Sequence, residues 1–369
     1  MPVSWTEVDP GAVRENARAI RRHLGGRPLI AVVKEDAYGH GAVAIARELD
    51  REPAVGGFAV ATCRQAVALK NAHVRKPVLV LLPVSAGEAA LYRRLGLAPT
   101  VASEADAAMV PPEDGCFPAH VKFDTGMGRL GFHWTRARAA AEFLRRRGIR
   151  RVAGVYTHLS APAEREFTRV QAERFQACRR ELVLAGISAD SVHLGGSPAV
   201  ARCPAVFRGI TPRPGLMLYG YGPEGTRTPF ALKPALEFKA RVAAVREVPA
   251  GSTVSYGHTW TAPRRSRLAL LPAGYSAGLN RGLSGRGCAL IRGRRVKFRG
   301  IVCMNLTVAD VTGLPDCRPG DTAVLIGRQG RERIGADELA DLTGTIPYEV
   351  LCTAGGLNPR VIVGGGRGS

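Results

Sequence analysis

Short apolar segments alternate with amphipathic segments along the first two-thirds of the chain. The apolar segments are rich in β-branched residues and have the length of buried strands, whereas the amphipathic ones repeat apolar residues at the spacing of a helix face. Because strand-like and helix-like segments alternate, the pattern predicts parallel βα units. Eight strand-like segments occur in order, at residues 29–34, 57–61, 78–83, 99–103, 120–124, 152–158, 191–194 and 215–219.

Eight parallel strands are the number that closes a (β/α)8 barrel, so the sequence predicts an α/β fold of this TIM-like kind. The helices expected around it cover residues 42–49, 64–71, 86–95, 135–147 and 167–184. A doubly wound open sheet is the structural alternative. That fold commonly carries a G-x-G-x-x-G segment after its first strand, and this sequence has none there.

From about residue 235 the pattern changes to short alternating strands separated by Pro- and Gly-containing turns. Strands are expected at 237–246, 267–271, 288–291, 300–308 and 322–326, with one helix at 336–342. The sequence therefore predicts two domains, an N-terminal barrel over residues 1–234 and a small all-β domain over residues 235–369.

The chain of 369 residues carries 52 basic and 31 acidic side chains, a formal charge of +21. Only seven of the basic residues are lysines. The charge is spread along the whole length instead of forming a tail or a stripe, which favours solubilising charge over a nucleic-acid partner. No apolar run approaches the roughly 18 residues of a membrane helix, and the N-terminus lacks the order of a signal peptide, so we expect no membrane partner and a cytoplasmic location.

Eight cysteines are scattered without a C-x-x-C pair or a Cys/His cluster at zinc spacing. In a chain without an export signal they are expected to be reduced thiols, and no metal site is expected.

Polar residues follow several of the predicted barrel strands, where such folds place their active sites. Lys34 comes directly after the first apolar segment, in Val-Val-Lys-Glu-Asp-Ala-Tyr-Gly-His-Gly. A buried lysine has a lowered pKa and can form a Schiff base, whereas a surface lysine would only lay its stem along the fold. Taken alone, this segment leaves both interpretations open.

Further strand ends carry groups suited to anions. Arg129 stands among three glycines, which let the backbone approach a ligand, and its guanidinium can bind a carboxylate through two hydrogen bonds. His158 ends the sixth segment, and Gly-Gly-Ser at 195–197 opens a helix after the seventh. Backbone N–H groups at such a helix start bind anions.

The segments K-x-D-A-Y-G-H-G, V-K-F-D-T-G-M-G-R-L-G and R-P-G-L-M-L-Y-G resemble those of the alanine racemase family. The later segments V-S-Y-G-H-T-W, L-P-A-G-Y, V-C-M and I-P-Y-E-V do so as well, in the same order. The resemblance covers essentially the whole chain. It implies a pyridoxal-5'-phosphate-dependent isomerase that interconverts L- and D-alanine, acts as a homodimer with shared active sites, and has an amino acid as its substrate.

The resemblance also assigns roles to residues of this sequence. Lys34 would hold the cofactor through a Schiff base and act as the base on one face of the substrate Cα, with Tyr256 of the partner subunit as the base on the other. Arg213 would hydrogen-bond the pyridine nitrogen, and His158 would support Tyr256. Arg129 would contact the cofactor's phenolic oxygen and the substrate carboxylate.

Lys122 matches a lysine that many members carry as a carbamate, which would orient Arg129. Tyr275 and Met304 would reach the active site across the dimer interface. The residues that would hold the cofactor phosphate are Tyr38, Ser197, Gly215, Leu216 and Tyr348.

Four positions depart from the family's pattern. Gly196 stands where asparagine is usual, Asn305 replaces an aspartate, Ser276-Ala277 replaces Ala-Asp, and Glu35 replaces a small residue. None of these changes removes a proposed base, so racemase chemistry is retained. The preferred amino acid stays open between alanine and another residue such as serine, as does a role in cell-wall D-alanine supply or in secondary metabolism.

Two other classes of protein share parts of this plan. A non-catalytic barrel that binds the cofactor would lack the β domain, and the presence of Tyr256 and Tyr348 argues against it. Decarboxylases with the same two-domain plan typically place an acidic residue, where this chain has Arg213, against the ring nitrogen.

Overall fold

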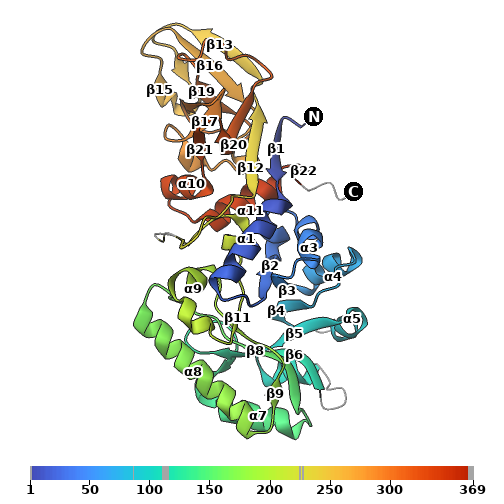
Figure 1. Ribbon diagram of the computed structural model, residues 1–369. Coiled ribbons are helices and arrows are strands. Elements are labelled where there is room, and N and C mark those ends of the chain that lie inside the picture. The colour runs from blue at the N-terminus through green and yellow to red at the C-terminus, as the bar shows by residue number, and fades with distance from the viewer. Residues whose placement is uncertain (1, 86, 110–115, 224–225, 227, 365–369) are drawn as a thin grey trace. The chain divides into compact units, whose positions relative to one another are not determined.

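The computed structural model describes residues 2–85, 87–109, 116–223, 226 and 228–364. The chain forms two compact units (Figure 1). The barrel unit comprises Val13–Ala37 and Ala42–Lys233, and the β unit comprises Met1–Ala12, Tyr38–Gly41 and Pro234–Ser369. Sequence order alone would place residues 1–12 and 38–41 with the barrel.

Eight parallel strands follow one another around the barrel unit in chain order. Val32 N donates a hydrogen bond to Pro214 O at 3.0 Å, which brings the two ends of this strand path together. The predicted barrel is therefore confirmed as a nearly closed eight-stranded one. Its strands are β2 (Leu29–Val32), β3 (Val55–Val60), β4 (Val78–Pro83), β5 (Leu97–Val101), β6 (Cys116–Asp124), β8 (Arg151–Tyr156), β10 (Val192–Leu194) and β11 (Thr211–Pro212). Two short strands pair alongside them, β7 (Phe132–His133) and β9 (Ser188–Ala189).

Helices connect the barrel strands, and each buries one face against them. On α7 (Ala137–Arg146) the buried residues are Ala137, Ala140, Ala141 and Leu144, which is the spacing of a single helix face. Four of the five predicted helices are confirmed within a few residues, and the fifth begins at Ala89; residue 86 lies outside the described residues. Besides α7, the helices around the barrel are α1 (Pro10–His23), α3 (Ala42–Asp50), α4 (Cys63–Asn71), α5 (Ala89–Leu95), α6 (Glu104–Met109), α8 (Arg165–Leu184) and α9 (Ser197–Arg202).

The eighth predicted strand is wrong in position. Residues 216–219 form a 3-10 turn, η3 (Leu216–Tyr219), and the strand is the preceding pair Thr211–Pro212. All four residues of η3 are buried. An apolar run that is buried on every side carries no periodicity that distinguishes a strand from a helical turn.

Directly after β2 the backbone makes one left-handed turn, labelled α2 (Lys34–Tyr38). Glu35, Asp36 and Ala37 have φ angles of 50, 52 and 56°, and Tyr38 continues at 54°. Left-handed backbone costs an L-residue about 1–2 kcal/mol per position. The carboxylate of Asp36 accepts a hydrogen bond from Ala42 N at 2.7 Å, which ties the end of this turn to the start of α3.

Glu35→Gly is expected to leave the free energy of unfolding unchanged or to raise it by up to about 1 kcal/mol, because glycine adopts left-handed backbone without the steric penalty. The identical substitution in right-handed helix α8, Glu181→Gly, is expected to lower it by about 1 kcal/mol. Chemical denaturation of both variants measures the difference. Equal losses at the two positions would contradict the left-handed turn.

The β unit is rich in strands, as predicted, and is divided among three sheets. The largest has the order β18-β17-β20-β12-β1-β22, a second has the order β13-β16-β19, and β14 pairs with β15. The predicted strand at 237–246 is two strands in different sheets, and only the end of the predicted strand at 300–308 is a strand, β19. The strands are β1 (Ser4–Val8), β12 (Leu236–Arg241), β13 (Ala244–Val248), β14 (Thr253–Val254), β15 (Trp260–Thr261), β16 (Ser266–Leu271), β17 (Cys288–Ile291), β18 (Arg294–Lys297), β19 (Thr307–Asp310), β20 (Thr322–Gln329), β21 (Glu332–Ile334) and β22 (Arg360–Ile362).

Two helices also belong to this strand-rich unit. The predicted helix at 336–342 is α10 (Ala336–Thr343). A second helix, α11 (Pro347–Leu357), was not predicted although it begins with proline at a favoured first-turn position. Its two glycines, Gly355 and Gly356, obscure the helical pattern. At Gly355 an added Cβ would lie 2.1 Å from Gly39 O, so the close approach of two backbones requires glycine.

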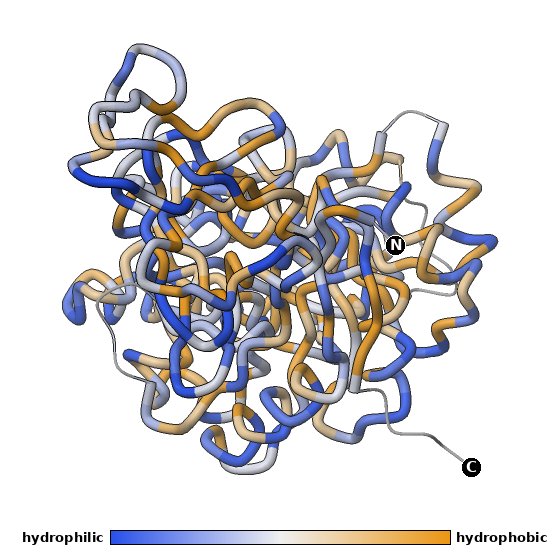
Figure 2. The backbone as a smooth tube through the Cα atoms, turned by 90° about the horizontal axis from the view of Figure 1, so that it is seen from above, coloured by the Kyte–Doolittle hydropathy of each residue, from blue (hydrophilic) through white to orange (hydrophobic). Residues whose placement is uncertain are grey.

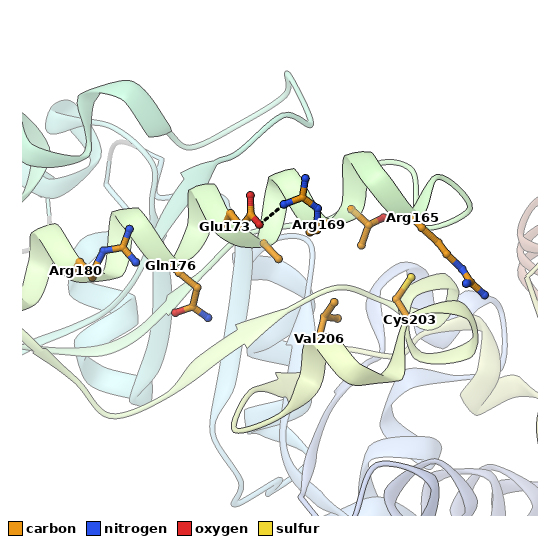
Figure 3. A pocket seen from close by; sticks show the side chains of 9 residues that line it. Arg165, Arg169, Glu173, Gln176, Arg180, Cys203 and Val206 are labelled. Atoms are coloured by element: carbon orange, nitrogen blue, oxygen red, sulfur yellow. Dashed lines mark hydrogen bonds and ion pairs between the residues drawn. The ribbon is translucent and has the colours of Figure 1, made fainter.

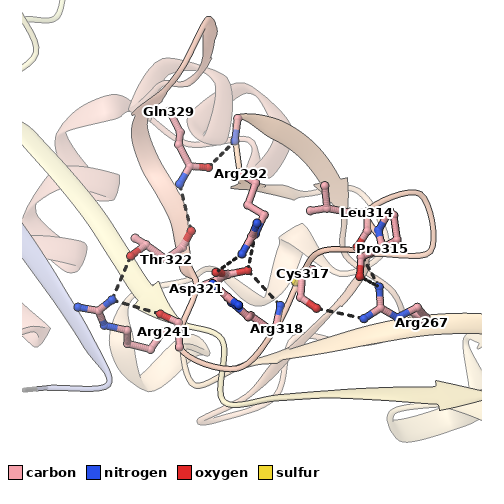
Figure 4. Close-up of polar contacts among 12 residues, drawn as sticks. Arg241, Arg267, Arg292, Leu314, Pro315, Cys317, Arg318, Asp321, Thr322 and Gln329 are labelled. Atoms are coloured by element: carbon pink, nitrogen blue, oxygen red, sulfur yellow. Dashed lines mark hydrogen bonds and ion pairs between the residues drawn. The ribbon is translucent and has the colours of Figure 1, made fainter.

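Arginine side chains fasten the loop that follows β19 (Figure 4). The Arg267 guanidinium donates to the carbonyls of Leu314, Pro315 and Cys317. Arg292 donates to the Asp321 carboxylate, which also accepts from the backbone N–H of Arg318. These two arginines are thus used in local structure, and hydrophilic (blue) segments are distributed over the whole backbone trace in Figure 2.

Candidate active site

The barrel gathers several of the predicted site residues at the carboxyl ends of its strands. Lys34 follows β2, Lys122 lies near the end of β6, and His158 follows β8. Burial lowers the pKa of His158 to about 3, and the positive charges of Arg213, Arg129, Lys122 and Lys34 lower it further. Groups that act on one imidazole in this way share one site, so the structure brings these five residues together.

Arg213 follows β11 and is almost completely buried. Its Nη1 donates to His193 Nδ1 at 2.8 Å, and its Nη2 donates to Thr157 O at 2.7 Å and faces His158 Nδ1 at 3.3 Å. In the described ranges, no carboxylate forms a salt bridge with it. Burial lowers its pKa to about 10, and the guanidinium remains charged at neutral pH.

A loop built on Asp124 presents Arg129. The Asp124 carboxylate accepts hydrogen bonds from the backbone N–H groups of four successive residues, 126–129, at 2.8–3.1 Å. Burial acts to raise the pKa of this carboxyl, but the four donors outweigh it and hold the pKa below its usual value. At Gly131 an added Cβ would lie 2.6 Å from Asp124 N, so the loop closes this tightly only with glycine there.

Lys122 has an unusual environment for a lysine. Its ammonium lies 5.4 Å from the centroid of the Tyr156 ring, and its side chain is buried. Burial lowers its pKa to about 8, helped by the positive charges of Arg213 and Arg129. Lys122 therefore has a larger fraction of neutral, nucleophilic amine at neutral pH than an exposed lysine.

Ser197 is the centre of a small cradle of backbone donors. Its buried hydroxyl accepts from Gly215 N at 3.0 Å and from Met217 N at 3.1 Å, which joins the start of α9 to η3. The preceding Gly195 has φ +64°, and a Cβ there would lie 2.8 Å from that of Ala199. At Gly196 a Cβ would meet only ordinary contacts, the nearest at 3.5 Å. Steric crowding therefore does not explain why glycine, and not the usual asparagine, stands at position 196.

The remaining predicted site residues lie in the β unit. The rings of Tyr38 and Tyr348 are 5.7 Å apart, and burial raises the pKa of Tyr348 to about 12. Tyr256 is 73% exposed, Met304 54% and Tyr275 42%. These are unusually large exposed areas for apolar or aromatic side chains.

Strained backbone precedes Tyr256. Ser255 has φ 67° and ψ −176°, a region that is essentially reserved for glycine. Its hydroxyl donates to Ile301 O at 2.9 Å. At Gly300 an added Cβ would lie 2.6 Å from that of Ser255, so the two segments are in close contact. Contacts with the segment around Gly300 and Ile301 therefore fix the backbone conformation that directly precedes Tyr256.

Three of the four departures from the family's pattern have visible partners. Asn305 Nδ2 donates to Ser276 Oγ at 3.0 Å, and Ser276 Oγ donates to Met304 O at 2.7 Å. The pair is neutral: Asn305 stands where the pattern supplies an aspartate, and Ser276 stands where it supplies an alanine. Glu35 is exposed and accepts from Gln65 of α4 at 3.1 Å, so its charge is held by a neighbouring helix.

Sequence reasoning assigned no role to several residues that shape this site. His193, Tyr156 and Thr157 surround Arg213, and Asp124 shapes the Arg129 loop. The available signal was the placement of polar residues inside strands that are otherwise apolar. Such residues must find partners when buried.

The hollow drawn in Figure 3 is a different feature. It has a volume of about 460 Å³ along α8 and contains none of the predicted site residues. Arg169 pairs there with Glu173, and Arg165, Gln176, Cys203 and Val206 complete much of its lining. The strand-end cluster, not this hollow, carries the groups suited to catalysis.

The barrel unit is expected to lose stability as the pH falls from 7 to 5, because His120 and His158 stay neutral when folded. Burial, followed by the Arg213 charge, lowers the pKa of His120 to about 4 and that of His158 to about 3. In the unfolded chain an imidazole has a pKa of about 6.5. The unfolded state therefore gains protons over this interval while the folded state does not, and unfolding becomes easier.

The expected loss is roughly 2 kcal/mol for each of these histidines between pH 7 and pH 5. Chemical denaturation at the two pH values measures it. A free energy of unfolding that is the same at both would show that the two imidazoles titrate normally in the folded chain.

Comparisons with known proteins agree with the fold. The family model described as alanine racemase, N-terminal domain, matches residues 8–223, and alanine racemase, C-terminal domain, matches residues 235–362. Together with the fold, these matches define a two-domain racemase, an isomerase built on a barrel. Among the described residues, no helix is long and apolar enough to cross a membrane.

Individual relatives extend over nearly the full length. The chain is 38% identical to an alanine racemase of Carboxydothermus hydrogenoformans, over 97% of this chain and 99% of that one, and 38% identical to one of Symbiobacterium thermophilum, over 98% and 96%. The crystal structure of alanine racemase from Streptomyces lavendulae matches with a TM-score of 0.89 at 31% identity, covering 99% of this chain and 98% of that one. The chain belongs to the alanine racemase family.

Proposed function

We propose that this protein is a pyridoxal-5'-phosphate-dependent racemase that interconverts L- and D-alanine as a homodimer. The observation that carries the proposal is Arg213, a buried cation held by neutral acceptors next to Lys34, Lys122, Arg129 and His158. Full-length relatives named alanine racemase support the substrate.

The residues present fit this cofactor. Arg213 uses Nη1 and Nη2 for contacts with the protein, while its Nε–H meets no acceptor among the described residues and can donate to a ring nitrogen. Lys34 supplies a half-buried amine at a strand end. Donors around Ser197, Gly215 and Leu216, with Tyr38 and Tyr348, would hold the phosphate. When bound, the cofactor supplies an electron sink that makes the Cα–H bond of an amino acid acidic.

The two proposed bases are Lys34 and Tyr256. Racemisation requires removal of the Cα proton from one face and return of a proton to the other, so two groups must flank that carbon. The Nζ atom of Lys34 would take or give the proton on one face and the phenolic oxygen of Tyr256 on the other. His158 stays neutral because its pKa is about 3, and its Nδ1 faces the donor Arg213 Nη2, so its Nε2–H would donate to the phenolic oxygen of Tyr256 and support it.

Arg129 would bind the substrate carboxylate, and Lys122 would orient it. A neutral Lys122 amine adds to dissolved carbon dioxide and releases one proton, giving a carbamate with a single negative charge. The pKa of about 8 at Lys122 favours this reaction, and the product would pair with a nearby arginine. Intact-mass measurement under carbon dioxide with Lys122→Ala as the control tests for the carbamate.

Incubation of the holoenzyme with a panel of single L-amino acids, followed by chiral chromatography, tests the proposed function. We expect alanine to racemise fastest and to reach equal amounts of the two enantiomers, because they have the same free energy in water. Faster conversion of serine or another polar amino acid would favour the second candidate substrate, which the neutral Ser276–Asn305 pair makes reasonable. Absence of any D-amino acid would refute a racemase.

Specific activity is expected to fall when the holoenzyme is diluted below the dissociation constant of the dimer. Tyr256 is 73% exposed in the single chain, and in the proposal it completes the active site of the other subunit. Activity assays and sedimentation across a dilution series measure both quantities. A monomeric sample with undiminished specific activity would contradict the shared site.

A further inference from the structure

Two buried histidines continue the hydrogen-bond chain of Arg213 into the barrel. Arg213 Nη1 contacts His193 Nδ1 at 2.8 Å, and His193 Nε2 contacts His120 Nδ1 at 2.7 Å. His193 is fully buried and His120 is 9% exposed. They come from β10 and β6, the two strands on either side of β8, and neither is used by the mechanism above.

The arginine fixes the position of every proton in this chain. A guanidinium only donates, so His193 Nδ1 must be the acceptor and its proton must lie on Nε2. That N–H then donates to His120, so His120 Nδ1 must also be unprotonated, with its own proton on Nε2. Both rings are neutral at pH 7, since burial, followed by the Arg213 charge, lowers their pKa values, that of His120 to about 4.

The surrounding barrel is shaped for this arrangement. At Gly154 of β8 an added Cβ would lie 2.3 Å from His120 Nδ1, so only glycine leaves room for the imidazole. Tyr156, two residues further on, stacks on His193 with ring centroids 4.7 Å apart and an angle of 15°. Its hydroxyl donates to Thr100, whose own proton goes to Val80 O. His193 is therefore held on its face and at both ring nitrogens.

We propose that His120 is a positioning residue, which acts through His193 to hold the Arg213 guanidinium so that its Nε–H faces the cofactor ring nitrogen; this rests on the proposed function. A buried cation without a carboxylate partner depends on well-directed neutral acceptors for its orientation. By accepting from His193 Nε2, His120 leaves His193 Nδ1 free to accept from Arg213. It also polarises the His193 ring and strengthens that acceptor.

Simple packing of the two imidazoles is the competing explanation. It requires neither a particular tautomer nor a hydrogen-bond acceptor at residue 120. The two explanations therefore differ in what an isosteric replacement does. Asparagine places an amide oxygen near the position of His120 Nδ1, whereas leucine fills similar space without any acceptor and leaves the His193 N–H buried and unpaired.

The kinetic test compares three holoenzymes. For His120→Leu we expect turnover with alanine to fall on the order of tenfold, the usual scale for removing an outer partner, with little change in KM. His120→Asn should recover most of the wild-type turnover. Leu144→Ala on helix α7 is the control, because it destabilises the barrel without changing the chain of hydrogen bonds and should keep its turnover. Equal turnover losses in His120→Leu and His120→Asn would overturn the proposal in favour of packing.

Nitrogen-15 NMR of the histidine rings gives a reading that does not depend on activity. In the full-length protein, with and without added pyridoxal phosphate, we expect His120 and His193 each to show a protonated Nε2 and an unprotonated Nδ1. The missing signals in His120→Asn assign His120. A proton on Nδ1 of either ring, or doubly protonated rings at pH 7, would overturn the proposal.

The two levels of inference fail in different ways. If the wild-type holoenzyme racemises no amino acid while the expected tautomers are present, the proposed function fails and the hydrogen-bond chain remains. If the wild type is active and His120→Leu keeps its turnover, the positioning role fails and the proposed function remains.

Discussion

Lys34→Ala is expected to abolish racemisation, with turnover lowered by more than about 10³-fold, because the variant lacks both the amine that would hold the cofactor and one of the two bases. The visible absorption of bound pyridoxal phosphate should be lost with it. Lys34 lies at the end of β2, where the chain enters the left-handed turn, and it is the only lysine in the segment between β2 and the next strand, β3. Activity assays and absorption spectra of the dialysed protein measure both effects.

Lys233→Ala is the matched control for this variant. Lys233 lies in the barrel unit and forms an exposed ion pair with Glu15. Exposed ion pairs contribute little to stability, so the control should retain its activity and its cofactor absorption. Measurable turnover in Lys34→Ala, at more than a tenth of the wild-type value, would be incompatible with the proposed role.

Tyr256→Phe is expected to lower turnover in both directions by about 10³-fold, since one of the two faces of the substrate loses its proton donor and acceptor. The remaining base should still exchange the Cα hydrogen of one enantiomer with solvent. In deuterium oxide, one enantiomer of alanine should therefore incorporate deuterium without racemising and the other should not. Mass spectrometry of each enantiomer, incubated separately, measures this asymmetry.

Stability should not change in this variant, because the Tyr256 side chain is 73% exposed and phenylalanine removes only the hydroxyl. Tyr92→Phe is the control for loss of a phenolic hydroxyl. That hydroxyl is buried and finds no hydrogen-bond partner among the described residues, so its removal should spare activity and raise stability. Rapid exchange of both enantiomers by Tyr256→Phe would exclude it as the second base.

Much of the strand-end cluster could be predicted from the sequence, because parallel strands in a barrel end at the same rim. Lys34 and His158 each end a strand-like run, so their proximity needed only the strand order. Arg213 precedes the run at 215–219 that was predicted as the eighth strand, and its place at the rim follows from the observed strand β11. The four backbone donors around Asp124 were less visible. They depend on how three glycines fold back, which is a property of the closed loop and not of any one residue type.

Other features were set by contacts between distant residues. Glu35, Asp36 and Ala37 have no sequence preference for left-handed backbone, so the turn after β2 is imposed by its surroundings. His120 and His193 are 73 residues apart in the chain, and their hydrogen bond exists only because β6, β8 and β10 are neighbours. The eighth strand was misplaced because the run at 216–219 is buried on all sides.

The basic side chains have at least two different uses. Arg213 and Arg129 have proposed roles at the active site, while arginines such as Arg267 and Arg292 fasten loops of the β unit. Lysine, the less common of the two basic residue types, is the better indicator of the site, because two of the seven lysines, Lys34 and Lys122, lie in the strand-end cluster.

The pairing of β1 has a consequence for the order in which the chain matures. Strand Ser4–Val8 lies between Leu236–Arg241 and Arg360–Ile362 in the largest sheet of the β unit. During synthesis from the N-terminus, β1 must therefore wait for two strands that are made much later, β12 and β22. The barrel can close first, with its leading segment left as an unpaired edge. Truncation before residue 360 would remove β22, one of the two partners of β1, and expose one edge of β1, so nascent chains stalled just short of residue 360 should be especially prone to aggregate.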